Sequence, residues 1–404
     1  MSQLWTLDDL GDLAGTAVFV RVDFNVPLEG GLVVDDNRLV EALPTIRELA
    51  GAGARVILAS HCGRPKGEPD PRYSLRPVAV RLAELLGQAV RFASDSVGDE
   101  VEAMVGRLAD GEVCLLENLR FHPGETKNDP GFAARLAALA EVFVGDAFGT
   151  VHRAHASVVG VPELLERKAA GRLVEREVAA LSRLLEDPKR PFVALLGGAK
   201  IEGKIDTIEN LLPRIDRLLL GGGMANTFLT ARGHDLGDSL VDAERVGLAA
   251  DLLERAEATG VEVLLPTDLV VEEGLEALRE PRTVRVSEVP PGAKALDIGP
   301  ATSAAFIEAF SDARTLFWNG PLGVFERQPF DRGTEAVAHA LVRLGRRGAF
   351  TVLGGGETVA AAARAGVLDA VGHVSTGGGA SLELLAGKTL PGLAVLEKPV
   401  ETGP

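Results

Sequence analysis

The length, composition and charge of the chain exclude several classes of protein. With 404 residues, the chain is longer than one hydrophobic core usually supports, and we expect two domains. A hydrophobic fraction of 46% and a charged fraction of 25% are typical of globular proteins and argue against a disordered or fibrous chain. The net charge of −16 argues against nucleic acid as a partner, so any bound anion must be held by a local group of cations.

The sequence predicts a cytoplasmic protein with no membrane partner. The first residues, MSQLWTLDDL, lack the basic and apolar pattern of a signal peptide, and no run of about 18 apolar residues occurs. Cys62 and Cys114 are too few for a disulfide scaffold, and we expect them to be free thiols in a reducing compartment.

Two series of apolar strands and helices follow one another along the chain. The first series predicts strands at 17–22, 55–60, 112–117 and 142–146, with helices near 37–50, 75–86 and 131–140. A long helix ended by Pro188 is expected over 171–188, and the strand pattern then restarts in PFVALLGG, RLLLGGG, VEVLLP, TLFWNG and AFTVLGGG. This β-α-β order predicts an α/β fold with two doubly wound parallel-sheet (Rossmann-like) domains, at 1–170 and 189–404, joined by a hinge helix at 171–188.

In the first half, polar and cationic residues follow the predicted strands. They lie in DFN (23–25), HCGR (61–64), ENLRFH (117–122) and DAFGTVHR (146–153), and Arg38 begins the first helix. Any one such residue is as often an ordinary surface or capping group as a ligand-binding residue. Four successive strand ends, however, would converge on one crevice, because ligands of open α/β sheets bind beyond the carboxyl ends of the strands. The arginines predict a small, multiply charged anion as the ligand.

In the second half, glycines follow the predicted strands instead. The clusters are GGAK (197–200), GGG (221–223), GGG (354–356) and STGGGAS (375–381), each before an expected helix. Exposed backbone N–H groups at a helix start favour phosphate, so four clusters predict a nucleotide site. Lys200 and Lys204, four residues apart at a helix start, would lie on one face and point at phosphates, with a solvated lysine pair as the alternative.

Three other interpretations fit parts of the sequence. Gly198 to Lys204 fit the spacing of a P-loop, but Ile205 stands where that motif has a Ser or Thr for magnesium. A bilobal solute-binding protein would also close two α/β lobes on an anion, but it normally requires export. His152 and His155 lie near Asp146, yet no third soft ligand is close in sequence, and we expect a structural or anion-facing role rather than a metal site.

Ten segments in order resemble the signature blocks of the phosphoglycerate kinase family, and they span nearly the whole chain. The P-loop match is then accidental, because the loop from Gly197 to Lys204 is similar to that family's own nucleotide-binding segment. The ten segments are RVDFNVP (21–27), HCGRP (61–65), LLENLRFHPGE (115–125), DAFGTVHRAHAS (146–157), LLGGAKIEGKI (195–205), GGGMANTF (221–228), DIGP (297–300), WNGPLGVFE (318–326), GGGET (354–358) and STGGGASLELL (375–385).

The resemblance implies a site in each half and assigns residues to it. In the first half, 3-phosphoglycerate would be bound by Asp23, Asn25, Arg38, His61, Arg64, Arg120 and Arg153. In the second half, Lys200 would face the transferring phosphoryl group, and Lys204 would face the phosphates of Mg-ADP or Mg-ATP. The remaining nucleotide residues would be Gly197, Gly221 and Gly222 at the base slot, Pro321, Val324 and Glu326 around base and ribose, Gly354, Gly355 and Gly356 in the third glycine cluster, Glu357 and Thr358 at magnesium and phosphate, and Gly377, Gly378 and Gly379 toward the γ-phosphate.

The implied reaction is reversible phosphoryl transfer between 1,3-bisphosphoglycerate and ADP, giving 3-phosphoglycerate and ATP in glycolysis. In-line transfer requires the protein only to align two oxygens and neutralise charge, and Arg38 and Lys200 are the expected catalytic residues. We expect a monomer, and with one substrate on each half its domains would close before transfer.

The chain departs from the family pattern at four positions. Cys62 replaces the usual Leu, Val151 replaces a small residue, and Gly203 replaces a polar one. Glu357 replaces the usual Asp that faces Mg²⁺, and its extra methylene moves the carboxylate outward by about 1.5 Å. None of these changes removes a cationic ligand.

Overall fold

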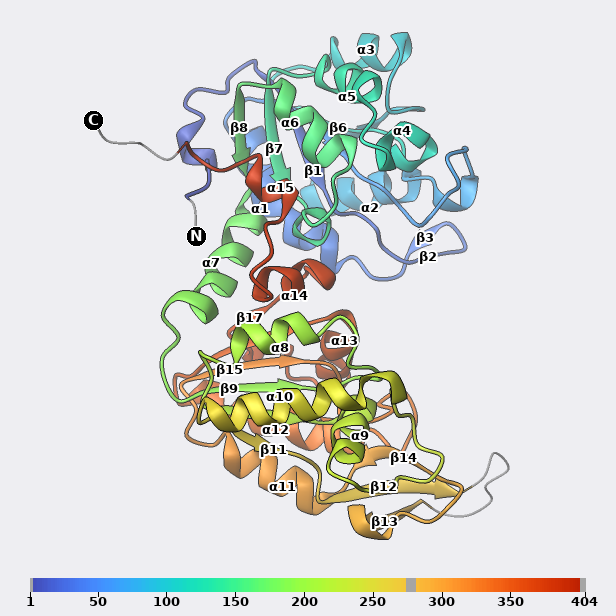
Figure 1. The fold of residues 1–404 in the computed structure, drawn as a ribbon. Helices are drawn as coiled ribbons and strands as arrows, with labels where there is room; N and C mark the ends of the chain where they lie inside the picture. Colours follow the sequence, from blue (N-terminus) through green and yellow to red (C-terminus); the bar gives the residue numbers. More distant parts are fainter. Residues whose placement is uncertain (1–2, 274–280, 400–404) are drawn as a thin grey trace, which may run out of the picture. The chain divides into compact units, whose positions relative to one another are not determined.

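The computed structural model describes residues 3–273 and 281–399 (Figure 1). The chain forms two compact units, Met1–Ala179 with Thr389–Pro404, and Ala180–Lys388. The predicted division differs for residues 389–399, which the sequence assigned to the second domain. Trp5 N donates to Leu396 O at 2.9 Å and Gly392 N donates to Val151 O at 2.8 Å, so this segment packs on the first unit.

The first unit contains a six-stranded sheet in which every pair of neighbours is parallel. Its strand order is β5-β6-β4-β1-β7-β8, and a separate two-stranded hairpin is formed by β2 and β3. The strands are β1 (Ala17–Val22), β2 (Leu28–Glu29), β3 (Leu32–Val33), β4 (Arg55–Ala59), β5 (Val90–Phe92), β6 (Val113–Leu115), β7 (Val142–Asp146) and β8 (Arg167–Ala170).

Helices cover this sheet because apolar residues recur along one side of longer helices such as α1, α2 and α5. Leu39 of α1 and Val78 of α2 pack with Val20 of β1 in one buried cluster. The opposite face of β1 carries Phe19, which stacks on Phe143 of β7. The helices are α1 (Asn37–Gly51), α2 (Arg76–Leu86), α3 (Asp99–Val105), α4 (Pro123–Thr126), α5 (Pro130–Ala137), α6 (Val161–Leu164), α7 (Arg172–Glu186) and α15 (Pro391–Ala394), with the short turns η1 (Leu7–Asp9), η2 (Pro71–Tyr73), η3 (Leu119–Phe121), η4 (Phe148–Thr150) and η5 (Ala156–Gly160).

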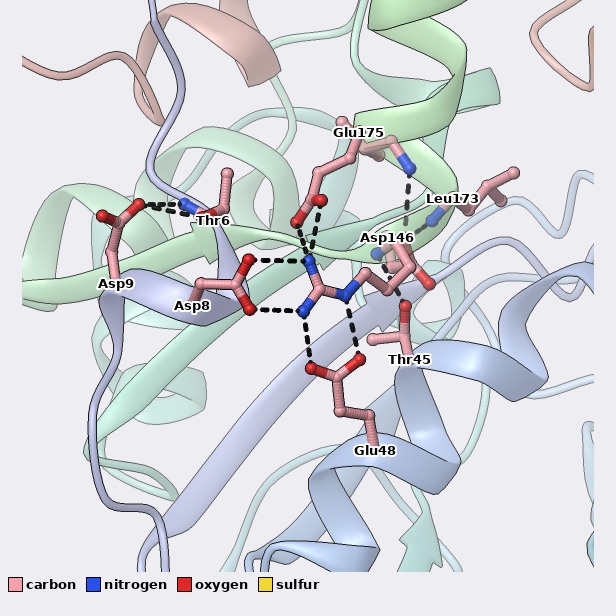
Figure 2. A network of polar contacts seen from close by, with 10 residues as sticks. Thr6, Asp8, Asp9, Thr45, Glu48, Asp146, Leu173 and Glu175 are labelled. Carbon is pink, nitrogen blue, oxygen red and sulfur yellow. Dashed lines mark hydrogen bonds and ion pairs between the residues drawn. The ribbon is translucent and has the colours of Figure 1, made fainter.

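A network of polar contacts fixes the first turn of α7 (Figure 2). Arg172 pairs with Asp8 at 2.7 Å, with Glu48 at 2.7 Å and with Glu175 at 2.9 Å. Its backbone N–H donates to Thr45 Oγ1 at 2.8 Å. The helix that follows the first unit's sheet is therefore attached to α1 and to η1.

Asp146, at the end of β7, caps the same helix. Its Oδ1 accepts the N–H groups of Leu173 at 2.9 Å and Val174 at 3.3 Å (Figure 2). Burial raises the pKa of Asp146 to about 7, and the hydrogen bonds to these backbone groups only partly oppose that shift. Asp146 therefore caps the start of α7 through Oδ1.

We expect Asp146 to make stability depend on pH. An unfolded Asp has a pKa near 3.9, so the native state binds this proton more tightly than the unfolded state does. The resulting stabilisation of the native state is fully present below pH 3.9 and is lost as pH rises through about 7. In the parent, this group lowers the free energy of unfolding by at most about 1.4 kcal/mol per pH unit. The Asp146→Asn variant cannot titrate at this position, so its free energy of unfolding, measured in urea from pH 4 to pH 8, should fall less steeply. Equal slopes for parent and variant would contradict the assignment.

The second unit has its own parallel sheet, in the order β11-β10-β9-β15-β16-β17. A three-stranded antiparallel sheet, β13-β12-β14, accompanies it and was absent from the sequence prediction. The strands are β9 (Phe192–Leu196), β10 (Arg217–Leu220), β11 (Glu262–Leu264), β12 (Asp268–Glu273), β13 (Arg282–Arg285), β14 (Ala293–Ile298), β15 (Thr315–Asn319), β16 (Phe350–Gly354) and β17 (His373–Val374).

The core of the second unit joins the sheet to α11 and α12. Leu195, Trp318 and Leu353 from three adjacent strands pack in one cluster with Phe306 and Leu341. The helices are α8 (Ile205–Leu211), α9 (Gly222–Ala231), α10 (Val246–Ala258), α11 (Pro300–Ala309), α12 (Arg332–Arg346), α13 (Gly356–Arg364) and α14 (Gly379–Leu385), with the short turns η6 (Ala243–Arg245), η7 (Val286–Glu288) and η8 (Leu368–Ala370). Across residues 3–273 and 281–399, no helix has the length and apolar character needed to cross a membrane.

Candidate functional site

The predicted anion-binding residues of the first unit lie at one edge of its sheet. Asp23 follows β1, His61 follows β4, Arg120 lies in η3 after β6, and Arg153 follows η4 after β7. These four strands are adjacent and parallel, so their carboxyl ends share an edge. The strand order therefore brings these four loops to one edge of the sheet, and their convergence on one ligand site stays a prediction.

Hydrogen bonds connect these loops to one another. Arg38 Nη1 lies 2.5 Å from Asp23 Oδ2. Asn25 Oδ1 accepts Gly63 N–H at 2.8 Å, and Arg120 Nη1 donates to Gly63 O at 2.8 Å. The loops after β1, β4 and β6 and the start of α1 are therefore held together by their own contacts.

The loops hold more positive charge than their own carboxylates offset. Burial lowers the pKa of Arg120 to about 10, and nearby Arg153 and Arg21 lower it further. Burial, with Arg21 and Arg120 beside it, also holds the pKa of His61 well below its usual range. An anion would relieve this repulsion, because opposite charge favours the protonated forms.

Two of the predicted cations have donors available for such an anion. Arg120 Nε is buried without a hydrogen-bond partner within the described residues. Arg64 is exposed and has no hydrogen bond or ion pair in the same part of the chain. A small anion with several oxygens could accept from both guanidinium groups.

Arg21 is a contributor that the sequence analysis missed. It is only 2% exposed, its Nη2 lies 3.1 Å from His61 Nδ1, and its Nε donates to Ser157 Oγ at 2.8 Å. Ser157 in turn donates to Glu125 Oε1 at 2.6 Å. A charged residue inside the apolar strand AVFVRV was the available signal, because a buried Arg requires partners.

The two histidines discounted as metal ligands take part in other contacts. Arg153 Nε lies 3.1 Å from His152 Nε2, and His155 Nδ1 lies 3.8 Å from Glu125 Oε1. Burial lowers the pKa of His155 to about 4, and Arg120 and Arg21 lower it further. Among the residues that the structure describes, no group of three or more His, Cys, Asp or Glu side chains could hold a metal ion.

The glycine-rich loops of the second unit meet beside its two central strands. Gly197 follows β9, and Gly320 follows the neighbouring strand β15. A Cβ on Gly197 would lie 2.2 Å from Pro321 O, and one on Gly222 would lie 2.8 Å from Gly198 O. These main chains approach so closely that a side chain at either position would force them apart.

The third and fourth glycine clusters also begin helices, as predicted. Gly355 is the N-cap of α13, and Gly378 is the N-cap of α14. A Cβ at Gly356, Gly378 or Gly379 would meet nothing within 4 Å, so these backbones face open space. Thr358 is fully buried, and its Oγ1 accepts Gly320 N–H at 2.6 Å.

The predicted geometry of the two lysines is wrong. Helix α8 begins only at Ile205, so Lys200 and Lys204 both precede it and do not share a helix face. Lys204 Nζ donates to Gly197 O, and burial lowers the pKa of Lys204 to about 8 although Glu357 opposes the shift. Lys200 is exposed and has no hydrogen bond or ion pair within the described residues.

A cavity of about 410 Å³ opens beside these loops, and we call it the second-unit cavity. Of the predicted nucleotide residues it is lined by Gly222, Pro321, Val324, Glu326 and Glu357. The others are not among its lining residues, namely Gly197, Lys200, Lys204, Gly221, Gly354, Gly355, Gly356, Thr358, Gly377, Gly378 and Gly379.

The walls of the second-unit cavity combine exposed apolar side chains with a carboxylate. Leu240 and Val324 are 50% and 39% exposed, which is unusual for large apolar residues, and both line the cavity. Leu240 was missed because its surroundings in sequence show no motif. Glu357, on the first turn of α13, supplies an exposed carboxylate at the same cavity.

Comparisons with known proteins agree over nearly the whole chain. The profile of the family described as phosphoglycerate kinase matches residues 7–388. The chain is 58% identical over 393 residues to a phosphoglycerate kinase of Thermus thermophilus, covering 97% of this chain and 99% of that protein. It is 52% identical over 388 residues to one of Acaryochloris marina, covering 96% and 97%. The solved structure of phosphoglycerate kinase from Coxiella burnetii superposes with a TM-score of 0.87 at 38% identity, covering 98% of this chain and 99% of that one. The chain therefore belongs to the phosphoglycerate kinase family.

Proposed function

We propose that this protein transfers a phosphoryl group reversibly between 1,3-bisphosphoglycerate and ADP, giving 3-phosphoglycerate and ATP in glycolysis. The observation that carries this proposal is the group of cations at the first unit's strand ends, where Arg120 and Arg21 are buried and where burial, together with nearby Arg153 and Arg21, lowers the pKa of Arg120 to about 10. A substrate with a phosphate and a carboxylate would supply the missing negative charge. Because the chain belongs to the phosphoglycerate kinase family, this function is favoured over a P-loop NTPase or a solute-binding protein.

The acceptor site would use the residues that surround that charge. Arg64 and Arg120 have donors available, and Arg38 is held by Asp23 near the same loops. We assign 3-phosphoglycerate binding to Asp23, Asn25, Arg38, His61, Arg64, Arg120 and Arg153.

The nucleotide site would occupy the second-unit cavity and the helix starts beside it. Leu240 and Val324 would contact the base, and Glu326 the ribose. The phosphates would meet Lys204 and the open backbones that begin α13 and α14, where N–H groups favour anions. Gly197 and Gly222 would serve mainly by letting these main chains come close, and Gly221 and Gly354 by leaving room for the side chains of Leu322 and Phe317.

Transfer would be in line, after the two units have closed around both substrates. Arg38 and Lys200 would offset the charge that spreads over the three equatorial oxygens of the moving group. An exposed Lys200 with no partner in the described residues is available for that role. Closure would also exclude water, which otherwise competes as the acceptor.

The single carboxylate of Glu357 fits a magnesium ion that arrives with the nucleotide. Mg²⁺ keeps several waters and takes one or two carboxylates plus substrate phosphates, rather than a cage of protein ligands. Bound in that way, the ion would offset the charge of the nucleotide phosphates. Glu357 would serve it directly or through a retained water.

A coupled assay tests the proposed function. ATP-dependent phosphorylation of 3-phosphoglycerate should be detected, while glycerate and acetate, which lack the phosphate, should give no comparable rate. Equal rates with all three acceptors would contradict the assignment of the cationic loops to a phosphorylated substrate.

The role of Glu357 can be tested by titrating magnesium at fixed nucleotide. Glu357→Ala should need about tenfold more magnesium for half-maximal rate, a size typical of a lost metal-site contact, whereas Glu357→Asp should stay active. Glu335, in the first turn of α12, offers the matched control because it is exposed and does not line the second-unit cavity. If Glu357→Ala kept the parent's magnesium dependence, Glu357 would not be a metal-site residue.

The proposed setting is a cytoplasmic monomer that binds only small molecules. Cys62 and Cys114 are buried free thiols, which suits a reducing compartment. The net charge of −16 supports the absence of nucleic acid as a partner.

A further inference from the structure

Asp297 is a buried carboxylate at the wall of the second-unit cavity. It lies one residue before the end of β14, is 3% exposed, and is among the residues that line the cavity. The nucleotide site proposed above gives it no role. Its carboxylate contacts backbone groups of β14 and α12.

The carboxylate accepts hydrogen bonds from two separate backbone positions. Its Oδ2 accepts Gly333 N–H, in the first turn of α12, at 2.8 Å, and its Oδ1 accepts Ile298 N–H at 2.8 Å. A Cβ on Gly323 would lie 2.3 Å from Asp297 Oδ1, and one on Gly333 would lie 2.6 Å from it. The main chain therefore lies directly against the carboxylate at both glycines.

Gly323 belongs to the segment 321–324, which lines the second-unit cavity. Leu322 N donates to Thr334 Oγ1 at 3.0 Å, and Val324 N donates to Leu296 O at 2.8 Å. On its other side the segment accepts Gly222 N–H through Leu322 O at 3.1 Å. The segment is thus held by α12 and β14, and the side chain of Asp297 extends from β14 to the first turn of α12.

No cation pairs with Asp297 within the described residues, although burying a charge without one is costly. Burial raises the pKa of Asp297 to about 7, with nearby Asp331 adding to the shift, while the two backbone donors oppose it. A buried carboxylate with a strongly raised pKa is often part of a functional site, so we expect Asp297 to have a role beyond packing.

Asp268 offers a direct comparison in the same unit. It is also buried, and its carboxylate accepts Ala301 N–H at 3.0 Å and Thr302 N–H at 2.7 Å at the start of α11. Asp268 does not line the second-unit cavity. The two aspartates therefore share burial and helix-start contacts and differ in what lies beside them.

We propose that Asp297 is a positioning residue for nucleotide binding: by bridging β14 and the first turn of α12, it fixes the segment 321–324 so that Pro321 and Val324 face the cavity. This inference rests on the proposed nucleotide site. Asp297 does not touch the reacting atoms, so it acts on nucleotide affinity rather than on phosphoryl transfer itself.

The test compares Asp297→Asn with Asp268→Asn in the full-length protein. In Asp297→Asn an NH₂ group replaces one acceptor and faces a backbone donor, which should displace the segment. We expect the KM and the calorimetric Kd for ADP to rise about tenfold, the size that one lost buried hydrogen bond gives. The KM for 3-phosphoglycerate should stay within twofold of the parent. Asp268→Asn should lower the melting temperature and leave both KM values unchanged.

Thr334→Val provides a second variant should Asp297→Asn fail to fold. It removes the hydroxyl that accepts Leu322 N–H from the same segment, so it should raise the KM for ADP selectively as well. Unchanged ADP affinity in Asp297→Asn, or in Thr334→Val where the former does not fold, would overturn the proposal. So would an equal rise of both KM values. If the parent did not phosphorylate 3-phosphoglycerate, the proposed function would fail, while ADP calorimetry would still decide the role of Asp297.

Discussion

Replacing Arg38 by Ala should reduce kcat by a factor of about 10²–10³ or more while 3-phosphoglycerate still binds measurably. That range is typical for the loss of one group that stabilises transition-state charge. Arg38 is one of several cations near the substrate, so the others can retain ground-state affinity. Its Nη1 is oriented by Asp23 at 2.5 Å, and its side chain is 39% exposed, which leaves the rest of the guanidinium available.

Steady-state kinetics with both substrates varied would measure this effect. Arg47→Ala is the matched control, because Arg47 lies on the same helix, is exposed, and within the described residues donates only to Leu85 O, at 2.8 Å. The control should keep the parent kcat. Normal turnover at saturating substrate combined with a large rise in the KM for 3-phosphoglycerate would mean that Arg38 acts in binding rather than in transfer.

Much of the fold could be predicted because the central strands are buried on both faces. Strands β1, β9 and β15 consist wholly of buried residues and appear in the sequence as mainly apolar runs, interrupted in β1 by Arg21. The antiparallel sheet of β12, β13 and β14 gave no such signal. Strand β13 is mostly exposed, and β12 pairs with β14 through an irregular register between Val270 and Val271.

The C-terminal segment shows what local pattern leaves undetermined. Leu390, Leu393 and Leu396 are buried, and their spacing of three indicates an apolar helix face. That spacing does not say which unit the face meets, because the answer depends on contacts far away in sequence, such as the one between Trp5 and Leu396.

Some residues of the candidate site could likewise be predicted from the sequence, and others could not. Strand-end residues such as Asp23 and Arg120 could be found because parallel topology brings them to one edge. The arrangement of Lys200 and Lys204 could not, since Gly203 adopts a φ of +79° and α8 starts only after it. Arg21 and Asp297 were not predicted as site residues because their role depends on burial, which the spacing of residues in the sequence does not reveal.

Gly197→Ala should impair nucleotide binding and stability together, because the new Cβ would meet backbone rather than a movable side chain. It would lie 2.2 Å from Pro321 O and 2.7 Å from Gly320 O. Gly197 N also donates to Asn319 O at 2.9 Å, so the residue cannot move away without breaking the junction of β9 and β15. We expect a loss of about 1–3 kcal/mol in the free energy of unfolding, the usual cost of overpacking.

The effect on ligands should be confined to the nucleotide. Gly198, Gly222 and Pro321 line the second-unit cavity next to the clash, so the Kd for ADP measured by calorimetry should rise at least about tenfold, equivalent to 1.4 kcal/mol. The Kd for 3-phosphoglycerate should not change, since that site belongs to the first unit. Gly247→Ala, in α10, is the matched control: its Cβ meets nothing within 4 Å, and Ala in a helix is favoured over Gly by roughly 0.5–1 kcal/mol. If Gly197→Ala kept the parent's melting temperature and ADP affinity, the close approach of these two strand ends would not be what shapes the nucleotide site.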